Sequence, residues 1–291
     1  MEKLVSVIMS TYNETESELS SSVFSILNQT YKNIEFIIIN DNPNNDILVK
    51  FFEKISDNRI KIINNERNIG LVESLNRALK ICHGSYIARM DADDISYYNR
   101  IHDQVVFLEK YNYDLVGSSV DLIDEHSHFL KHQYVPQNTA VLLRKLKRKN
   151  ILPHPTWLGK RELFYELHGY RNIPSCEDYD FILRAMRQNK RIGCTNSVLL
   201  KYRIRSTSIT QSNYSRQYVL SKYLKYAISQ GETVENIEMY IMSDAYMKDV
   251  SEHKKFKKAK DNIKGRNFIG KDVFDFITSK YLVELLKDKI L

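Results

Sequence analysis

The sequence of 291 residues contains few of the residues that mark several protein classes. Only 9 glycines and 5 prolines occur, which excludes collagen-like and linker-like composition. The 3 cysteines show no C-x-x-C spacing, so neither a disulfide framework nor a zinc ribbon is supported. Because 43% of the residues are hydrophobic, we expect a folded protein with a substantial core and reduced, mostly buried thiols.

Long apolar runs are also missing. No stretch of about eighteen consecutive apolar residues occurs, so the sequence predicts no membrane-spanning helix. The first apolar run stops at Ser10 and is too short for the hydrophobic part of a signal peptide. These two observations predict a cytoplasmic location, with peripheral contact to the inner face of the membrane left open.

Two phosphate-binding motifs are absent as well. The chain has no G-x-G-x-x-G after a strand and no G-x-x-x-x-G-K-[ST]. Dinucleotide-dependent dehydrogenases and P-loop ATPases therefore lose their main support.

Strand-like apolar runs alternate with helix-period stretches up to about Val120, which is typical of parallel βαβ units in an α/β protein. The predicted strands are 4–9, 34–39, 59–63, 86–89 and 115–120, and the predicted helices are 16–29, 47–55, 71–80 and 100–109. Later segments predict a turn at 124–126, helices at 161–167 and 177–188, and a strand at 197–204. After about Tyr214 the pattern becomes helical. We expect one domain at 1–212, with halves at 1–120 and 121–212, and a helical extension at 213–291.

Acidic side chains occupy positions where open α/β sheets bind ligands, beyond the carboxyl ends of strands. Asp91 and Asp93 follow the predicted strand at 86–89 and can converge on a hard cation such as Mg²⁺ or Mn²⁺. The chain contains two D-x-D motifs where chance predicts about one, so the position carries this argument. A solvated turn is the alternative. Asp41 follows the strand at 34–39, where it either binds a nucleoside or opens an Asx-turn.

A second acidic group, Glu177 and Asp178 with Asp180, opens the predicted helix at 177–188. Acidic residues favour the first turn of a helix, and Asp180 can pair with Arg184 four residues later, so a structural role is one reading. The functional reading is a general base that removes a proton from an acceptor hydroxyl.

Five ordered motifs resemble the family-2 glycosyltransferases of the GT-A fold. They are SVIMSTYN at 6–13, ILNQTY at 26–31, NIGL at 68–71, ARMDADD at 88–94 and EDYD at 177–180. The resemblance covers about residues 4–210 and implies a Rossmann-like, mostly parallel nucleotide-binding sheet flanked by helices. It also implies an inverting enzyme that uses a nucleotide-diphosphate sugar. We expect transfer of a hexose or N-acetylhexosamine from a UDP-sugar to a surface glycan of a capsule, lipopolysaccharide or glycoprotein.

The resemblance also implies roles for single residues. It places Asp178 as the catalytic base and Asp93, with Asp91, as ligands of Mn²⁺ or Mg²⁺. Donor binding is implied for Thr11, Tyr12, Asp41, Arg67 and Asp91. Glu177, His154 and Trp157 are implied on the acceptor side, although a buried core position explains Trp157 equally well.

The chain departs from the family pattern in two places. Where relatives commonly read Asp-Asp-Gly-Ser, it has Asn40-Asp41-Asn42-Pro43, which keeps the carboxylate but alters its loop. Where many relatives read Tyr-Arg-x-His, it has Tyr202-Arg203-Ile204-Arg205. Arginine cannot ligate a metal but can hold a diphosphate with two hydrogen bonds. We therefore expect Arg203 or Arg205 to contact the leaving phosphates, with a weakened dependence on metal.

Positive charge is concentrated near the C-terminus. The net charge is +7, and residues 248–271 hold nine Lys and Arg against three Asp and Glu. A solvated helix face, an anionic membrane surface or a partner, including a second copy of the chain, would each explain this segment. Two other functions fit the residues less well. A nucleotidyltransferase usually has a Gly-rich loop after its first strand, and a nucleic-acid-binding module would carry a recognised motif, so no nucleic-acid partner is expected.

Overall fold

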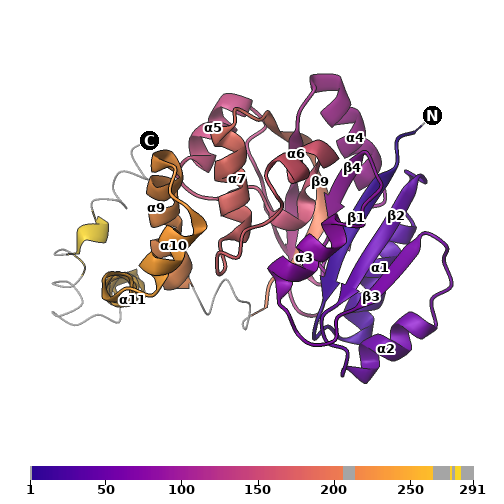
Figure 1. Ribbon diagram of the computed structural model, residues 1–291, viewed down its shortest axis with the longest axis horizontal. Helices are drawn as coiled ribbons and strands as arrows, with labels where there is room; N and C mark the ends of the chain where they lie inside the picture. Colours follow the sequence, from indigo (N-terminus) through magenta and orange to yellow (C-terminus); the bar gives the residue numbers. More distant parts are fainter. Residues whose placement is uncertain (1, 206–213, 265–275, 277–278, 283–291) are drawn as a thin grey trace. The chain divides into compact units, whose positions relative to one another are not determined.

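The computed structural model describes residues 2–205, 214–264, 276 and 279–282 (Figure 1). The chain divides into two compact units. The first unit comprises Met1–Asn172 and Glu177–Ser208, and the second comprises Ile173–Cys176 and Ile209–Leu291.

A nine-stranded sheet forms the centre of the first unit (Figure 1). Its first four strands run parallel in the order β3-β2-β1-β4 and are β1 (Val5–Thr11), β2 (Ile34–Asn40), β3 (Ile60–Asn64) and β4 (Tyr86–Arg89). The order continues with β8 (Leu158–Lys160), β6 (Leu115–Ile123), β9 (Ile192–Arg203) and β5 (Ile95–Ser96). A further strand, β7 (Phe129–Gln133), pairs antiparallel with β6. The predicted α/β class is confirmed.

Helices cover both faces of this sheet because its central strands are apolar on both sides. In β1, Val7 and Met9 face one core and Ile8 faces the other. The first core is completed by α1 (Glu16–Leu27), α2 (Asp46–Glu53) and α4 (Arg100–Tyr111). The second is completed by α3 (Leu71–Leu79), α5 (Thr139–Leu146), α6 (Arg161–Glu166) and α7 (Glu177–Arg187).

The register of the parallel strands brings their carboxyl ends to one edge. Thr11 at the end of β1 lies opposite Asn40 at the end of β2, and Asn40 lies opposite Asn64 at the end of β3. The Asn40 side chain donates to Asn64 Oδ1 at 2.9 Å. We call this edge, together with the loop that follows β4, the carboxyl edge.

Two short strands of the sheet were not predicted from the sequence. β8 has three residues, including Gly159, and β5 has two, so neither shows a periodicity that could predict it. Strand β9 begins at Ile192 rather than at residue 197, because its first four residues are buried beside β6.

The second unit is helical. It contains α9 (Tyr214–Gln230), α10 (Val234–Ile241) and α11 (Asp244–Lys264). His253 is buried at its centre, where its ring stacks on Tyr218 with centroids 4.2 Å apart. The segment Ile173–Cys176 joins this unit through a hydrogen bond from Gln217 Nε2 to Ser175 O at 2.8 Å. Across the residues that the structure describes, no helix is long and apolar enough to cross a membrane.

Candidate active site at the carboxyl edge

The loop after β4 carries the first pair of carboxylates, Asp91 and Asp93. Asp91 is half-buried and forms an ion pair with Arg89, whose Nη1 lies 2.5 Å from Asp91 Oδ1. Ser22 of α1 donates to the Asp91 carbonyl at 2.8 Å and fixes the loop against the helix. Burial and the charge of Asp91 raise the pKa of Asp93 to about 6. The two carboxylates therefore lie close enough to repel one another.

Arg205 bridges this loop to α1. Its Nη2 lies 3.1 Å from Asp93 Oδ2 and 2.9 Å from Glu18 Oε1. Glu18 is the third residue of α1, and its other oxygen accepts from the backbone N–H of Thr15 in a capping box. The helix start thus holds the carboxylate that orients Arg205.

Arg203 has a structural role, which corrects the expectation that it contacts phosphates. Its side chain is buried and donates to the carbonyls of Asp93, Asp124 and Glu125 and to Ser127 Oγ. Four of its five N–H groups are therefore used inside the protein. Of the two arginines that were expected to bind phosphate, Arg205 alone has an accessible guanidinium.

The ends of β1 and β2 place Thr11, Tyr12 and Asp41 together. Tyr12 is 45% exposed, and its backbone carbonyl accepts from Asn42 at 3.1 Å, which ties the β1 loop to the β2 loop. Thr11 is buried, and its hydroxyl has no hydrogen-bond partner among the residues described. Arg67 is exposed on the loop before α3.

Asp41 is buried and already accepts three hydrogen bonds. Its Oδ1 accepts from Asn65 at 2.7 Å and from the Ile69 N–H at 2.8 Å, and its Oδ2 accepts from the Gly70 N–H at 2.9 Å. Because a carboxylate has about four acceptor positions, one remains on Oδ2. Asp41 therefore fastens the loop before α3, and its predicted contact with a nucleoside stays a prediction.

The second pair of carboxylates, Glu177 and Asp178, opens α7. Asp178 accepts from Asn150 Nδ2 at 2.7 Å and from the N–H of Tyr179 at 2.6 Å. Burial raises the pKa of Asp178, and these hydrogen bonds oppose the rise. Burial and the charge of Asp178 raise the pKa of Glu177 to about 7. Both carboxylates thus have raised pKa values, which suits a general base.

Arg89 connects the two pairs. Its guanidinium is fully buried, pairs with Asp91, and also opposes the rise in the pKa values of Glu177 and Asp178. One buried cation therefore acts on both carboxylate pairs, although β4 and α7 are about 90 residues apart in the chain. Both pairs follow Arg89 in the sequence, and the charge of Asp91 also raises the pKa of Glu177, as expected for groups of one site.

Asp180 is structural. It is fully buried between Arg171 and Arg184, and its Oδ2 lies 2.8 Å from Arg184 Nε. The predicted pair between Asp180 and Arg184 is confirmed. The acidic motif therefore contributes two residues to the site and one to the anchoring of α7.

Two residues that were expected on the acceptor side lie in the core instead. Trp157 is fully buried and donates from Nε1 to the Leu152 carbonyl at 3.2 Å, so neither ring face is open to a sugar. His154 is 9% exposed and hydrogen-bonded to the Tyr170 hydroxyl at 2.9 Å. Burial and the charge of Arg89 lower its pKa well below the usual value.

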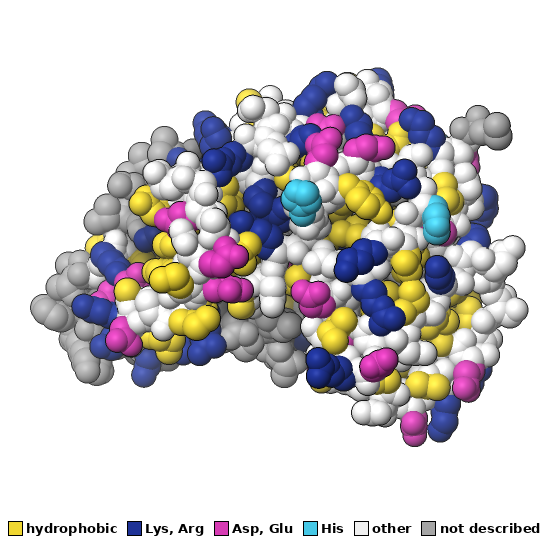
Figure 2. Space-filling view, in the orientation of Figure 1, with side chains coloured by type: hydrophobic (Ala, Val, Ile, Leu, Met, Phe, Trp, Pro, Cys, Tyr) yellow, Lys and Arg dark blue, Asp and Glu magenta, His cyan; other side chains and the backbone are white. Residues whose placement is uncertain are grey.

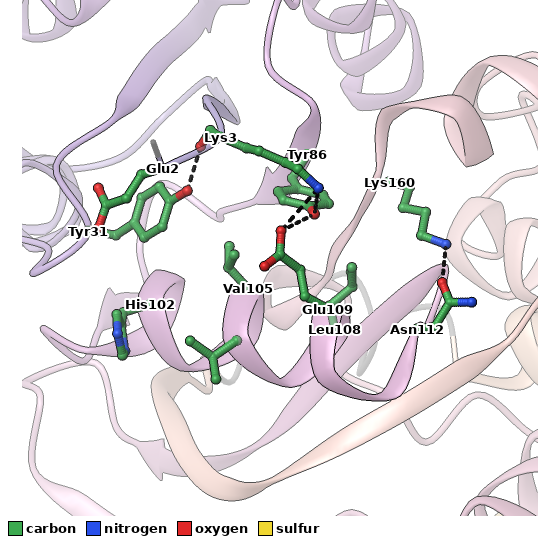
Figure 3. A pocket seen from close by; sticks show the side chains of 11 residues that line it. Glu2, Lys3, Tyr31, Tyr86, His102, Val105, Leu108, Glu109, Asn112 and Lys160 are labelled. Carbon is green, nitrogen blue, oxygen red and sulfur yellow. Dashed lines mark hydrogen bonds and ion pairs between the residues drawn. The ribbon is translucent and has the colours of Figure 1, made fainter.

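A cavity of about 560 Å³ lies away from this edge, at the amino ends of β1 and β4 (Figure 3). Lys3 Nζ, the Tyr86 hydroxyl and the Glu109 carboxylate point toward one another at its wall (Figure 3). The amino ends of parallel strands are not where open α/β sheets bind substrates, and the carboxylate pairs are absent from its lining. This cavity is therefore distinct from the candidate active site.

Sequence reasoning missed three residues of the site: Arg89, Glu18 and Asn150. The capping box at Thr15 and Glu18 is readable in the sequence, but the partner of Glu18, Arg205, is 187 positions away. Arg89 lies inside a strand, where an apolar neighbourhood gives no sign of a buried charge. Only the folded chain shows these contacts.

Comparison with known proteins identifies the fold and the family. The model of "Glycosyl transferase family 2" matches residues 6–167. An uncharacterized glycosyltransferase of Methanocaldococcus jannaschii, MJ1057, is 36% identical over 76% of this chain and 77% of its own. The O-antigen biosynthesis glycosyltransferase WbnJ of Escherichia coli is 32% identical over 80% of this chain and 92% of its own.

Two further proteins carry more specific names. The UDP-Glc:alpha-D-GlcNAc-diphosphoundecaprenol beta-1,3-glucosyltransferase WfgD of Escherichia coli is 30% identical over 72% of this chain and 81% of its own. The crystal structure of S. aureus TarS 1–349 in complex with UDP-GlcNAc matches with a TM-score of 0.61 and 16% identity. That match covers 97% of this chain and 91% of the other. It supports the GT-A architecture, and the family match covers the first four of the five motifs, up to ARMDADD at 88–94. The chain belongs to glycosyl transferase family 2 and is a glycosyltransferase.

Proposed function

We propose that this enzyme transfers a hexose or N-acetylhexosamine from a UDP-sugar to a hydroxyl of a surface glycan, with inversion at the anomeric carbon. The observation that carries the proposal is the ion pair of buried Arg89 with Asp91, together with the charge effect of the same guanidinium on the pKa values of Glu177 and Asp178. An in-line displacement needs a base on one face of the sugar and neutralised charge on the departing diphosphate. Two separate carboxylate pairs in one site supply both requirements.

Asp178 is the base in this proposal. Its carboxylate takes the proton of the acceptor hydroxyl while the hydroxyl oxygen forms a bond to the anomeric carbon. The bond from that carbon to the diphosphate oxygen breaks, and its electron pair leaves with UDP. Asn150 donates to Asp178 Oδ2 at 2.7 Å and the Tyr179 N–H donates to Oδ1 at 2.6 Å, and these two contacts fix the orientation of the carboxylate. Glu177 lies beside it as a second carboxylate on the acceptor side.

Asp91 and Asp93 fit a divalent ion, Mn²⁺ or Mg²⁺. No cluster of three or more metal-ligating side chains occurs within the described ranges, but such ions often take one or two carboxylates and complete their shell with substrate phosphates. Both carboxylates are half-buried, and burial together with the charge of Asp91 raises the pKa of Asp93, so a nearby cation would stabilise the charged pair. When bound, the ion neutralises charge on the departing diphosphate.

The UDP part of the donor is supported by the names of two similar proteins and by the edge formed by Thr11, Tyr12 and Asp41. TarS was crystallised with UDP-GlcNAc, and the name of WfgD gives UDP-Glc. The free acceptor position on Asp41 Oδ2 suits an N–H donor of a nucleobase. Arg67 lies exposed on the loop that Asp41 fastens. Release of UDP from a panel of UDP-sugars, with and without Mn²⁺, tests the donor class, and no turnover of any UDP-sugar would refute it.

Arg205 is expected to hold the leaving phosphates. Its half-buried guanidinium is only partly used by Asp93 and Glu18, and its buried Nε has no hydrogen-bond partner among the described residues. We expect Arg205→Ala to raise the KM for the UDP-sugar about tenfold or more, because a hydrogen bond to a charged group contributes about 1.5–3 kcal/mol. The remaining activity should depend fully on added Mn²⁺. Steady-state kinetics with and without EDTA measure both effects.

Arg205→Lys is a second variant to compare with Arg205→Ala. It keeps the positive charge but cannot form two parallel hydrogen bonds to a diphosphate, so it should recover only part of the affinity for the UDP-sugar. Exposed Arg187, at the far end of α7, provides the matched control as Arg187→Ala. An unchanged KM in Arg205→Ala would remove Arg205 from the donor site.

The basic helix α11 is proposed to dock the enzyme on an anionic membrane, where a lipid-linked acceptor would lie. The name of WfgD gives a diphosphoundecaprenol acceptor, and that of WbnJ gives O-antigen biosynthesis. His253, Phe256 and Ala259 are buried on one face of α11, and the opposite face carries exposed lysines. Lys and Arg side chains lie among acidic and apolar ones over α10 and α11 in Figure 2. Residues 265–271 of the basic segment lie outside the described residues.

Binding to lipid vesicles tests this docking. We expect binding to phosphatidylcholine vesicles only when phosphatidylglycerol is added. Reversing Lys254, Lys255 and Lys258 to Glu should weaken it by about 100-fold or more, at about 1 kcal/mol per basic residue near the surface. Reversing exposed Lys50, Lys61 and Lys80 to Glu is the matched control. Binding that does not depend on phosphatidylglycerol would instead indicate that the basic segment contacts a protein partner or a second copy of the chain.

A further inference from the structure

An exposed row of three aromatic rings lies on the hairpin of β6 and β7. Phe129 is 55% exposed, Tyr134 is 72% exposed, and the side chain of His132 between them is 49% exposed. The ring centroids of Phe129 and His132 are 4.8 Å apart, and those of His132 and Tyr134 are 5.6 Å apart. We call these three residues the ring ladder.

A β-bulge in β7 places the three rings on one face of the strand. Phe129 pairs with Ile123, whereas Lys131 pairs with Leu122, so Leu130 is an extra residue in β7. In a regular strand Phe129 and His132, which are three positions apart, would point to opposite faces, because side chains alternate. The bulge returns Phe129 to the face of His132 and Tyr134, which is how bulges redirect side chains in functional strands.

The ladder is held rigid from below. Asp121 of β6 is 8% exposed, and its carboxylate lies 2.5 Å from His132 Nδ1 and accepts from the Tyr97 hydroxyl at 2.6 Å. The central ring therefore keeps a fixed orientation while about half of its side chain stays exposed. Exposed rings with fixed orientation contribute contact area at a low cost in conformational entropy.

The hairpin that carries the ladder is tied to the candidate active site through Arg203. The hairpin turn is fastened by Arg203, which donates to the carbonyls of Asp124 and Glu125 and to the carbonyl of Asp93. The same side chain thus joins the loop of the metal-binding pair to the strand that carries the rings. A chain bound along the rings would lead toward the reacting hydroxyl.

We propose that the ring ladder binds the sugar residues of an oligosaccharide acceptor behind the residue that is glycosylated. This inference rests on the proposed transfer to a glycan. Apolar C–H faces of pyranoses stack on aromatic rings, and each ring spacing is comparable with the length of one sugar residue. Pairing of β7 with another strand is disfavoured, because the bulge and exposed Lys131 are devices that protect a free sheet edge.

Binding to an array of bacterial surface oligosaccharides, with the full chain as the probe, tests the proposal. The wild type should bind glycans of several residues, and Phe129→Ala with Tyr134→Ala should lower the apparent affinity about tenfold or more. Leu130→Ala is the matched control, since Leu130 is a 52% exposed apolar residue of the same strand outside the ladder. It should bind as the wild type does. Both changes affect exposed side chains, so the melting temperature should stay unchanged.

Hydrolysis of UDP-sugars without an acceptor separates this proposal from the proposed function. The double variant should hydrolyse them as fast as the wild type, because the ladder does not touch the donor. Absence of hydrolysis in every variant would count against the UDP-sugar donor and not against the ladder. The proposal is overturned if the wild type binds no oligosaccharide or if the double variant binds equally well. It is also overturned if the wild type sediments as a dimer and the double variant as a monomer, because the rings would then lie at an interface between two copies of the chain.

Discussion

Asp178→Asn is expected to lower kcat for sugar transfer by about 10²–10⁴-fold, the usual contribution of a positioned general base. Asparagine has the size of aspartate and can still pair with Asn150, but it cannot accept the proton of the acceptor hydroxyl. The fold and the KM for the donor should change little. Steady-state kinetics with the best UDP-sugar and acceptor measure the effect.

Asp46→Asn is the matched control for Asp178→Asn. Asp46 is an exposed residue at the first position of α2, so its replacement removes the same charge from the start of a helix. The control should keep wild-type activity. A loss of less than about tenfold in Asp178→Asn would mean that another group takes the proton.

Asp93→Asn is expected to lower kcat/KM for the UDP-sugar by about 100-fold or more, because the ion that it helps to hold contributes several kcal/mol of charge stabilisation. The loss should appear in both kcat and the donor KM. Arg205 keeps Glu18 as a partner at 2.9 Å, so the variant should remain folded. Titration of Mn²⁺ against activity should show a weakened dependence on the ion.

The same exposed-charge variant, Asp46→Asn, serves as the control for this experiment. Wild-type donor KM in Asp93→Asn would place the diphosphate elsewhere. Wild-type Mn²⁺ dependence together with a lost kcat would instead assign Asp93 to the sugar rather than to the ion.

The sequence predicted the α/β core well, because its signals are local. The run at Ile37, Ile38 and Ile39 is buried on both faces of the sheet, and the helix-period stretches became α1 to α4. The pair of Asp180 with Arg184 was also predictable, since it depends only on a spacing of four residues in one helix. The family match identifies a glycosyltransferase and not the two alternatives, a nucleotidyltransferase or a nucleic-acid-binding module.

Residues whose roles depend on distant partners were not predictable. Trp157 could have faced a sugar or the core, and only packing against Phe181 places it in the core. Arg203 and Arg205 are two positions apart in the chain. Arg203 donates to carbonyls of the hairpin turn, whereas Arg205 forms an ion pair with Asp93. Arg203 ends β9 opposite Ile123 at the end of β6, whereas Arg205 lies beyond the strand, and no local pattern encodes this register.

The central claim is that the two carboxylate pairs have separate tasks, with Asp91 and Asp93 on the diphosphate and Asp178 on the acceptor. Calorimetric titration of UDP with Mn²⁺ into the wild type, Asp93→Asn and Asp178→Asn tests this division without any acceptor. The account predicts that Asp93→Asn weakens UDP binding about tenfold or more while Asp178→Asn binds as the wild type does. Equal affinities in the two variants, or a loss confined to Asp178→Asn, would contradict it.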